Sequence, residues 1–237
     1  MTRPIEYSIF SASVTGPGHR RTDLPNQDAC LSFSKDGRTG IVLSDGLGSC
    51  EKSDKGSKAV CCAVVSAMEQ ETTAERFDTA RFLENVKSDY CASIDAEDYM
   101  DYQATCLWCF CPGDARLHAG MLGDGMCALV RRDGSIVRLS DNKTDGFSNV
   151  VLPLSPRTEI SQWQTMSIPE DEVDYVMLCS DGVSDDLVDA DGFVRAFFAE
   201  YGERVAAENE IAMMLENWPV PLHSDDKTII CMVRRRA

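Results

Sequence analysis

Hydrophobic residues fall into short segments separated by turn residues, and the spacing within each segment predicts its structure. Three segments near the N-terminus alternate apolar and polar residues or are continuously apolar, which predicts strands at residues 7–14, 29–34 and 40–44. Asp36-Gly37, between the second and the third, is a hairpin signal. Apolar residues three and four positions apart predict helices over about 54–70 and 76–95. The N-terminal part is therefore expected to form strands followed by two helices.

The pattern changes to short strands from residue 103 onward. Four strands are predicted from ATCLWCFC, ARLHAGMLG, MCALVRR and SIVRLS, and the turns PGD, GDG and RDG between them predict an antiparallel meander. The polar stretch 140–170 is expected to be irregular and to form a loop beside the site. A strand at 173–180, two helices across about 189–217 and a closing strand, KTIICMVRR, complete the pattern.

Runs of antiparallel strands with helices grouped between them predict an α+β architecture in which helices sandwich the sheets. The sequence contains no internal repeat, coiled-coil heptad, low-complexity tract or linker, so one domain is expected over residues 1–237. A chain of 237 residues is long enough to bury a substantial core without disulfides.

Composition and net charge limit the kinds of molecule that the protein is expected to bind. The formal net charge of −16 disfavours binding to nucleic acid or to an anionic membrane surface. The basic run Arg234-Arg235-Arg236 is too short to reverse this charge and is interpreted as a solvated tail. No apolar run reaches the length of a membrane span, and the first twenty residues lack a signal-peptide core and cleavage site. A cytoplasmic protein is expected.

The eleven cysteines are expected to be reduced and buried, because their number is odd and most lie in apolar segments. Cys106 and Cys109 have the spacing of a zinc knuckle, which is the alternative interpretation. In a strand, however, an odd separation directs the two sulfurs to opposite faces, so we expect them to pack in the core.

Aspartates stand where several predicted strands begin or end. They are Asp28 in PNQDA, Asp45 in SDGLGS, Asp124 in the GDG turn, Asp181 in SDGVSD, and Asp225 with Asp226 in SDDKT. Any one Asp-Gly pair is also an ordinary turn signal. If the carboxylates converge, their repulsion favours bound cations, and Mg²⁺ or Mn²⁺ takes oxygen ligands of this kind. The segment DNKTDG resembles a calcium loop, but Lys143 and Leu152 occupy ligand positions, so that interpretation is rejected.

Taken in order over residues 26–228, the motifs PNQDA, SDGLGS, GDG, SDGVSD and DDKT resemble the metal-dependent protein phosphatases (PPM), the PP2C-type serine/threonine phosphatases, in their short bacterial form. The resemblance covers nearly the whole chain. It implies a PP2C-like α/β/β/α sandwich of two antiparallel sheets flanked by helices. It also implies a centre of two Mn²⁺ or Mg²⁺ ions per chain, with a third in some members. The two Ser-Asp-Gly segments would approach from neighbouring strands to hold the same ions.

The resemblance also implies roles for individual residues. Asp45 would bridge both ions, and the carbonyl of Gly46 would bind one of them. Asp181 and Asp225 would complete the ligands of the first ion. Asp28 would contribute at the second ion through water. Asp28, Asp45 and Asp181 are thereby the expected catalytic set.

Other positions agree with the family less closely. Asp124 would form the weaker third site with Asp181, and Asp185 would orient metal-bound water. Many eukaryotic members have a His after the bridging Asp-Gly, proposed to protonate the leaving group, but here that position is Leu47, and bacterial relatives also lack it. The Arg that usually grips phosphate five residues before the first-motif Asp is replaced by Asp23.

The nearby HRR segment offers substitutes for that Arg. His19, Arg20 and Arg21 are candidate phosphate-binding residues, since guanidinium groups match phosphate oxygens bidentately; a solvated surface loop is the alternative. His19 is also a candidate proton donor in place of Leu47.

The expected function is hydrolysis of phosphoserine or phosphothreonine by a water activated at the metal pair. The expected partners are phosphorylated proteins and a serine/threonine kinase that supplies them. A catalytically weak phosphoprotein-binding or regulatory module on the same fold is the alternative. No cysteine begins a Cys-x5-Arg loop, which argues against a tyrosine phosphatase. Leu43, two positions before Asp45, argues against a dehalogenase-type phosphatase.

Overall fold

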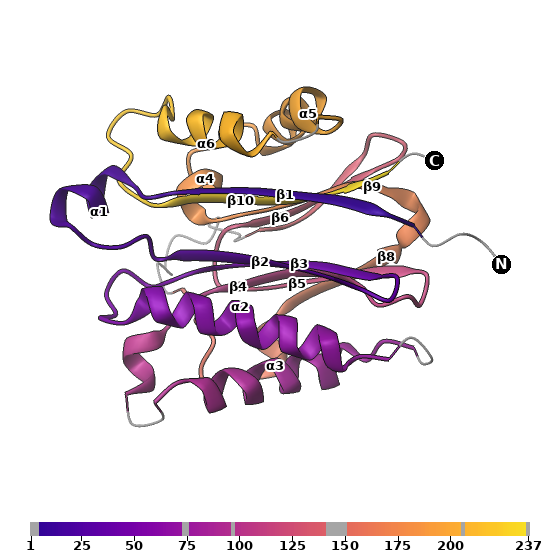
Figure 1. The fold of residues 1–237 in the computed structure, drawn as a ribbon, viewed down its shortest axis with the longest axis horizontal. Helices are drawn as coiled ribbons and strands as arrows, with labels where there is room; N and C mark the ends of the chain where they lie inside the picture. Colours follow the sequence, from indigo (N-terminus) through magenta and orange to yellow (C-terminus); the bar gives the residue numbers. More distant parts are fainter. Residues whose placement is uncertain (1–4, 73–75, 96–97, 141–150, 205–206, 236–237) are drawn as a thin grey trace.

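The computed structural model describes residues 5–72, 76–95, 98–140, 151–204 and 207–235. Two five-stranded antiparallel sheets pack face to face, with helices on both outer faces (Figure 1). The strand orders are β1-β10-β9-β6-β7 in one sheet and β2-β3-β4-β5-β8 in the other. The predicted α+β sandwich is confirmed.

The first sheet consists of β1 (Tyr7–Val14), β6 (Met126–Arg131), β7 (Ile136–Ser140), β9 (Val173–Cys179) and β10 (Lys227–Arg234). The second consists of β2 (Asp28–Lys35), β3 (Arg38–Asp45), β4 (Cys106–Cys111), β5 (Arg116–Leu122) and β8 (Gln164–Pro169). The α-helices are α1 (Pro17–Thr22), α2 (Ser53–Gln70), α3 (Thr79–Ser93), α4 (Asp181–Ser184), α5 (Ala190–Tyr201) and α6 (Glu208–Glu216). Short 3-10 helices are η1 (Tyr99–Tyr102), η2 (Ile160–Gln162) and η3 (Glu170–Glu172).

Helices α2 and α3 cover the outer face of the second sheet, and α5 and α6 cover that of the first (Figure 1). The outer faces therefore bury apolar residues as the inner faces do, which explains the continuous apolar runs of the central strands. Cys106 packs under α2 and α3, whereas Cys109 packs between the sheets. The predicted opposite orientation of the two sulfurs is confirmed, and all eleven cysteines are free.

The predicted meander is wrong at the GDG segment. β5 pairs with β4 and β8, whereas β6 pairs with β7 and β9, so residues 123–125 connect one sheet to the other. Both strands are buried on both faces, and an uninterrupted apolar run carries no sign of which neighbour it pairs with. Asp124 consequently lies in a connection between the sheets and not in a hairpin.

Strand β8 and the short helices α1 and α4 were not predicted. β8 lies within the stretch 140–170, which was expected to be irregular; it is an edge strand, and most of its residues are exposed or half-buried. α1 has six residues and buries none of them, so it has no apolar stripe to detect. Residues 141–150, which include the calcium-loop resemblance, lie outside the described residues.

The predicted helices agree with the structure to within a few residues. α3 begins at Thr79 because the Asp78 carboxylate accepts hydrogen bonds from the amides of Ala80 and Arg81. No helix in the described ranges combines the length and the apolar character needed to cross a lipid bilayer.

Candidate metal centre

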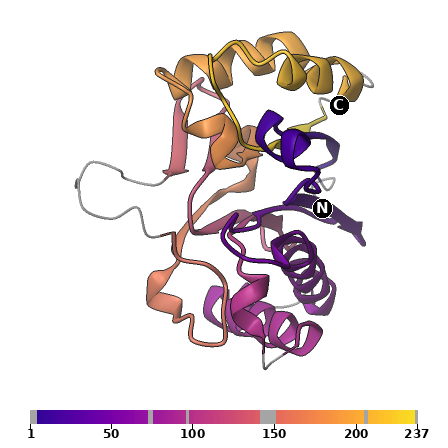
Figure 2. The same ribbon diagram turned by 90° about the vertical axis from the view of Figure 1, so that its left-hand side faces the viewer.

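A pocket of about 180 Å³ opens at the end of the sandwich where α1 and α4 lie, the end that faces the viewer in Figure 2. Five aspartates line it, together with neutral residues and one histidine. The acidic residues are Asp45, Asp124, Asp181, Asp225 and Asp226. The predicted aspartates of the motifs are thereby brought together from distant parts of the chain.

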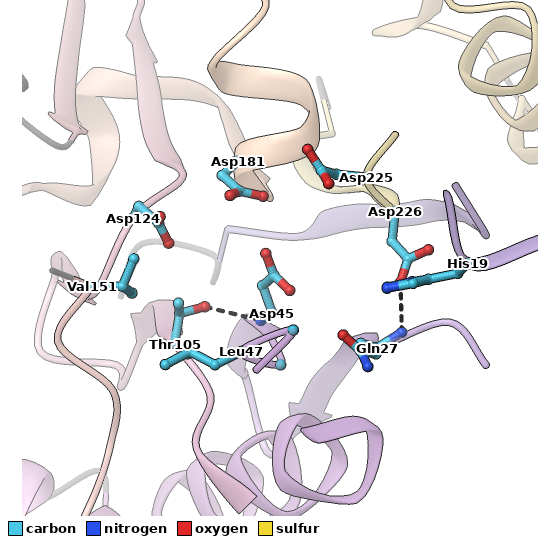
Figure 3. Close-up of a pocket in the computed structure, with 12 residues that line it drawn as sticks. His19, Gln27, Asp45, Leu47, Thr105, Asp124, Val151, Asp181, Asp225 and Asp226 are labelled. Atoms are coloured by element: carbon cyan, nitrogen blue, oxygen red, sulfur yellow. Dashed lines mark hydrogen bonds and ion pairs between the residues drawn. The ribbon is translucent and has the colours of Figure 1, made fainter. Parts of the chain in front are cut away.

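Asp45 is the last residue of β3, and its backbone is fixed from two sides. Its amide donates to the Thr105 hydroxyl at 2.9 Å, and its carbonyl accepts from the Thr105 amide at 2.7 Å. The next amide, that of Gly46, donates to the Gln27 carbonyl at 3.1 Å. These bonds hold the end of the strand so that the Asp45 side chain faces the pocket (Figure 3).

Asp28 lies behind Asp45, opposite it in the register of β2 and β3. It is buried, and the Ser180 hydroxyl donates to its Oδ2 at 2.8 Å. Its Oδ1 is buried without a hydrogen-bond partner among the described residues. A buried carboxylate oxygen without a donor is costly, and a cation would satisfy it.

Asp181 enters from the opposite sheet. β9 ends at Cys179, and Asp181 is the first residue of α4. In Figure 3 the carboxylates of Asp45 and Asp181 point toward each other. The expectation that the two Ser-Asp-Gly segments come from neighbouring strands is therefore wrong: β3 and β9 belong to different sheets, and face-to-face packing of these sheets brings the two segments together.

Burial raises the pKa of three of these carboxylates. For Asp28 the pKa rises through burial and then through the charge of Asp226. For Asp45 the pKa rises well above its usual range through burial, followed by the charges of Asp28 and Asp181. The pKa of Asp181 is raised by burial, with Asp185 and Asp225 adding to it. Among the described residues, no lysine or arginine lines the pocket to offset these charges.

Lys227 is a buried base that lines the adjoining pocket together with Asp181 and Asp225. Its ammonium donates to the Asp225 carbonyl at 3.2 Å and lies 3.1 Å from Nδ1 of His223, and burial lowers its pKa. These contacts are with a backbone oxygen and an imidazole, so the ammonium makes no direct ion pair with the carboxylates of the pocket.

The residues fit a hard divalent cation in two respects. Their donors are oxygens, which Mg²⁺ and Mn²⁺ prefer, and they gather several negative charges around a pocket that no described lysine or arginine lines. Within the described part of the chain, no three His, Cys, Asp or Glu side chains already form a closed ion site. The carboxylates would therefore complete such a site by turning toward a shared ion.

Most of the predicted metal-binding residues line this pocket. Asp45, Gly46, Asp124, Asp181 and Asp225 do so directly, and Asp28 lies behind Asp45. Asp185 lines an adjoining pocket that shares Asp181 and Asp225 with the first.

The three residues of the HRR segment, in contrast, do not all face the pocket. His19 lines the pocket. Arg20 instead lies 3.5 Å from Glu216 of α6, both side chains being about half exposed, and Arg21 is exposed; neither lines the pocket.

The structure adds a residue to which sequence reasoning gave no role. Asp226 is buried, and its two oxygens accept from the amides of Gly16 and Gln27 and contact the ring of His19. The doubled acid in SDDKT was a signal for it, but two adjacent aspartates do not indicate which one faces the pocket and which faces the backbone.

Comparisons with known proteins place the fold. A family model described as protein phosphatase 2C matches residues 15–218. A bacterial serine phosphatase structure is similar at a TM-score of 0.71 and 18% identity, covering 98% of this chain and 99% of that one. Serine/threonine phosphatase Stp1 from Staphylococcus aureus is similar at 0.69 and 17%, with coverage of 98% and 96%.

RsbX, solved in complex with magnesium, is similar at a TM-score of 0.64 and 14% identity, with coverage of 98% of both chains. A comparison with curated proteins gave no significant match. Identities this low support the fold, while the match of the family model covers most of the chain.

Proposed function

The chain belongs to the protein phosphatase 2C family, and from this membership we propose that it hydrolyses phosphoserine and phosphothreonine in proteins with the help of divalent cations. The observation that carries the proposal is the set of five aspartates around one pocket, with half-buried Asp45 at its centre and no lysine or arginine lining it among the described residues. A phosphatase requires such a cluster to hold cations, whereas a binding module gains nothing from its repulsion.

Asp45, the Gly46 carbonyl, Asp181, Asp225 and Asp28 would hold two ions, either Mn²⁺ or Mg²⁺. Asp124 would serve a third, and Asp185 would orient water beside the ions. When bound, the ions supply Lewis-acid activation of a water and neutralise charge on the phosphoryl group.

The residues of the chain fix the geometry of the reaction. Thr105 holds the backbone of Asp45, and Ser180 holds Asp28 across the two sheets. A new bond forms between phosphorus and the oxygen of water while the bond to the seryl or threonyl oxygen breaks, so no covalent phosphoenzyme is needed. A thiolate route is disfavoured because burial raises the pKa of Cys109 and Cys179.

The proposed substrates are phosphorylated proteins made by a serine/threonine kinase. All eleven cysteines are free, which suits a reducing compartment such as the cytoplasm.

The deciding experiment measures hydrolysis of a phosphoserine peptide and of p-nitrophenyl phosphate with and without Mn²⁺. Turnover that requires Mn²⁺ and disappears with chelator is expected. Absence of turnover at saturating Mn²⁺ or Mg²⁺, with phosphopeptide binding retained, would support the regulatory module instead.

A further inference from the structure

His19 forms a hydrogen-bonded pair with Asp226 at the edge of the pocket. The distance from Nδ1 of His19 to Oδ2 of Asp226 is 2.9 Å. Asp226 is only 4% exposed, and its position is fixed by the amides of Gly16 at 2.7 Å and Gln27 at 2.6 Å. A carboxylate held by two backbone amides is a rigid support for the imidazole.

The backbone around His19 packs closely against the segment that carries Asp226. The Gly18 amide donates to the Ser224 carbonyl at 2.9 Å. A Cβ atom at Gly16 would lie 2.3 Å from the backbone of Asp225, so α1 starts in direct contact with this segment. The ring of His19 therefore has little freedom to leave its position.

The ring faces the carboxylates from the side of the pocket opposite Asp124 (Figure 3). Its side chain is 21% exposed, and Nε2 makes no hydrogen bond to a described residue. The chain has three histidines. His118 is paired with Asp114, and His223 lies beside Lys227, so His19 is the only histidine that lines this pocket.

The remaining lining residues cannot readily supply a proton at neutral pH. Leu47 and Val151 are apolar, and Gln27 and Thr105 do not ionise in this range. Of the lining aspartates, Asp45, Asp124, Asp181 and Asp225 are cation ligands in the proposed function, whereas Asp226 binds the His19 ring. A seryl or threonyl alkoxide is a poor leaving group and benefits from a proton donor held near it, a role most often taken by histidine.

We propose that His19, oriented by Asp226, is the acid that protonates the leaving oxygen of the substrate; this inference rests on the proposed phosphatase function. Nε2 of the imidazolium gives its proton to the ester oxygen as the bond between that oxygen and phosphorus breaks. The attacking water forms the new bond to phosphorus and loses one proton to solvent. The products are the free hydroxyl side chain and inorganic phosphate, and the neutral imidazole takes a proton back from solvent. Asp226 is a positioning residue in this step.

The test compares two leaving groups with the holoenzyme at saturating Mn²⁺. A phosphoserine peptide releases an alkoxide that needs a proton, whereas p-nitrophenyl phosphate releases a stabilised anion that does not. His19→Gln is expected to lower kcat on the peptide by about 10²- to 10⁴-fold, the usual contribution of a general acid, and to change kcat on p-nitrophenyl phosphate by less than about threefold.

Equal losses on both substrates with a raised KM would mean that His19 binds phosphate, and would overturn the inference. Unchanged kcat on both substrates would overturn it as well. His223→Gln, a histidine close to the pocket but not lining it, is the matched control and should leave both substrates unaffected. The rise in melting temperature with Mn²⁺ should persist in His19→Gln, since this residue is not a proposed ligand.

Asp226→Asn is the second variant, and it decides the matter if His19→Gln does not fold. We expect a loss of about tenfold or more in kcat on the peptide, little change in KM and little change on p-nitrophenyl phosphate. Combining both substitutions should add little to the loss from His19→Gln alone. An equal loss on both substrates in Asp226→Asn would overturn the positioning role. If the wild-type protein hydrolyses neither substrate, the proposed function itself fails, and the inference with it.

Discussion

The core between the sheets and the pocket at their end use the same strands in opposite ways. Ile41 and Leu43 of β3 are fully buried among apolar side chains, and two residues later Asp45 is half-buried among acidic side chains. Apolar burial stabilises the fold by itself, whereas burial of like charges raises its energy. The comparison teaches that the apolar core is stable without any added group, whereas the pocket gathers like charges whose repulsion a bound cation would offset.

The strongest way to separate the two regions is to change the pocket alone. Asp45→Asn should lower phosphopeptide turnover at saturating Mn²⁺ by at least about a thousandfold, equivalent to about 4 kcal/mol, because it removes a charge from the central ligand. Its circular dichroism spectrum should match that of the wild type. Asp36→Asn, at the far end of the same hairpin, is the control, and near-normal turnover in Asp45→Asn would remove that residue from the proposed centre.

The converse experiment changes the core alone. Leu117 is fully buried between the sheets in β5. Leu117→Ala should lower the free energy of unfolding by about 2–5 kcal/mol, as measured by urea denaturation. Its kcat and Mn²⁺ requirement should stay unchanged below its melting temperature. A loss of Mn²⁺ binding in the folded variant would show that the two regions are not separable.

Removing the cations should lower the stability of the folded protein, because the carboxylates of the pocket then repel one another. Adding Mn²⁺ at about a hundred times its Kd should stabilise the protein by about 2.7 kcal/mol, which differential scanning fluorimetry would detect as a higher melting temperature. Because the folded pKa values of Asp28, Asp45 and Asp181 are raised, the metal-free folded state holds protons that the unfolded state releases.

Below the ordinary aspartate pKa of about 4, this difference disappears. As pH rises from there through the raised values, the metal-free protein should lose stability, so its melting temperature should fall between about pH 5 and pH 8. Mn²⁺ should flatten that slope. A melting temperature that changes neither with Mn²⁺ nor with chelator would contradict a metal centre.

The smallest effect is expected at the surface outside both regions. Arg20 and Arg21 are exposed and do not line the pocket, so neutralising both as Arg20→Gln with Arg21→Gln should change kcat/KM by less than about threefold, under 1 kcal/mol. Lys55→Gln with Lys58→Gln on α2 controls for the lost charge. A ten- to hundredfold loss confined to the arginine variant would restore them as phosphate-binding residues.

The sequence predicted the central strands and long helices well because their periodicity reflects burial. β3 and α2 each present buried apolar residues to their neighbours, and this burial produces a recognisable hydrophobic pattern in the sequence. α1 and β8 lack such a pattern, because α1 buries none of its residues and β8 is an edge strand with mostly exposed or half-buried residues. The crossing at Asp124 was missed because strand pairing depends on contacts far apart in the chain.

The same limit applies to the pocket. Motifs named Asp45 and Asp181, since each follows an apolar strand and precedes a glycine. The motifs could not predict that His19 pairs with Asp226, because this hydrogen bond depends on how α1 packs against the segment that precedes β10. Nor could they separate His19 from Arg20, since adjacent residues of a short helix point in different directions.

The hydrogen bond between Gly16 and Asp226 joins residues 210 positions apart, and this has a consequence for synthesis on the ribosome. β10 lies between β1 and β9, so the first sheet closes only after nearly the whole chain has emerged. Contacts this distant in sequence form late, after the entropy of a long loop has been lost. A nascent or truncated chain that ends before residue 225 would carry Asp45 and Asp181 without Asp225, Asp226 or β10. Phosphatase activity should therefore appear in one step, when the last strand enters the sheet.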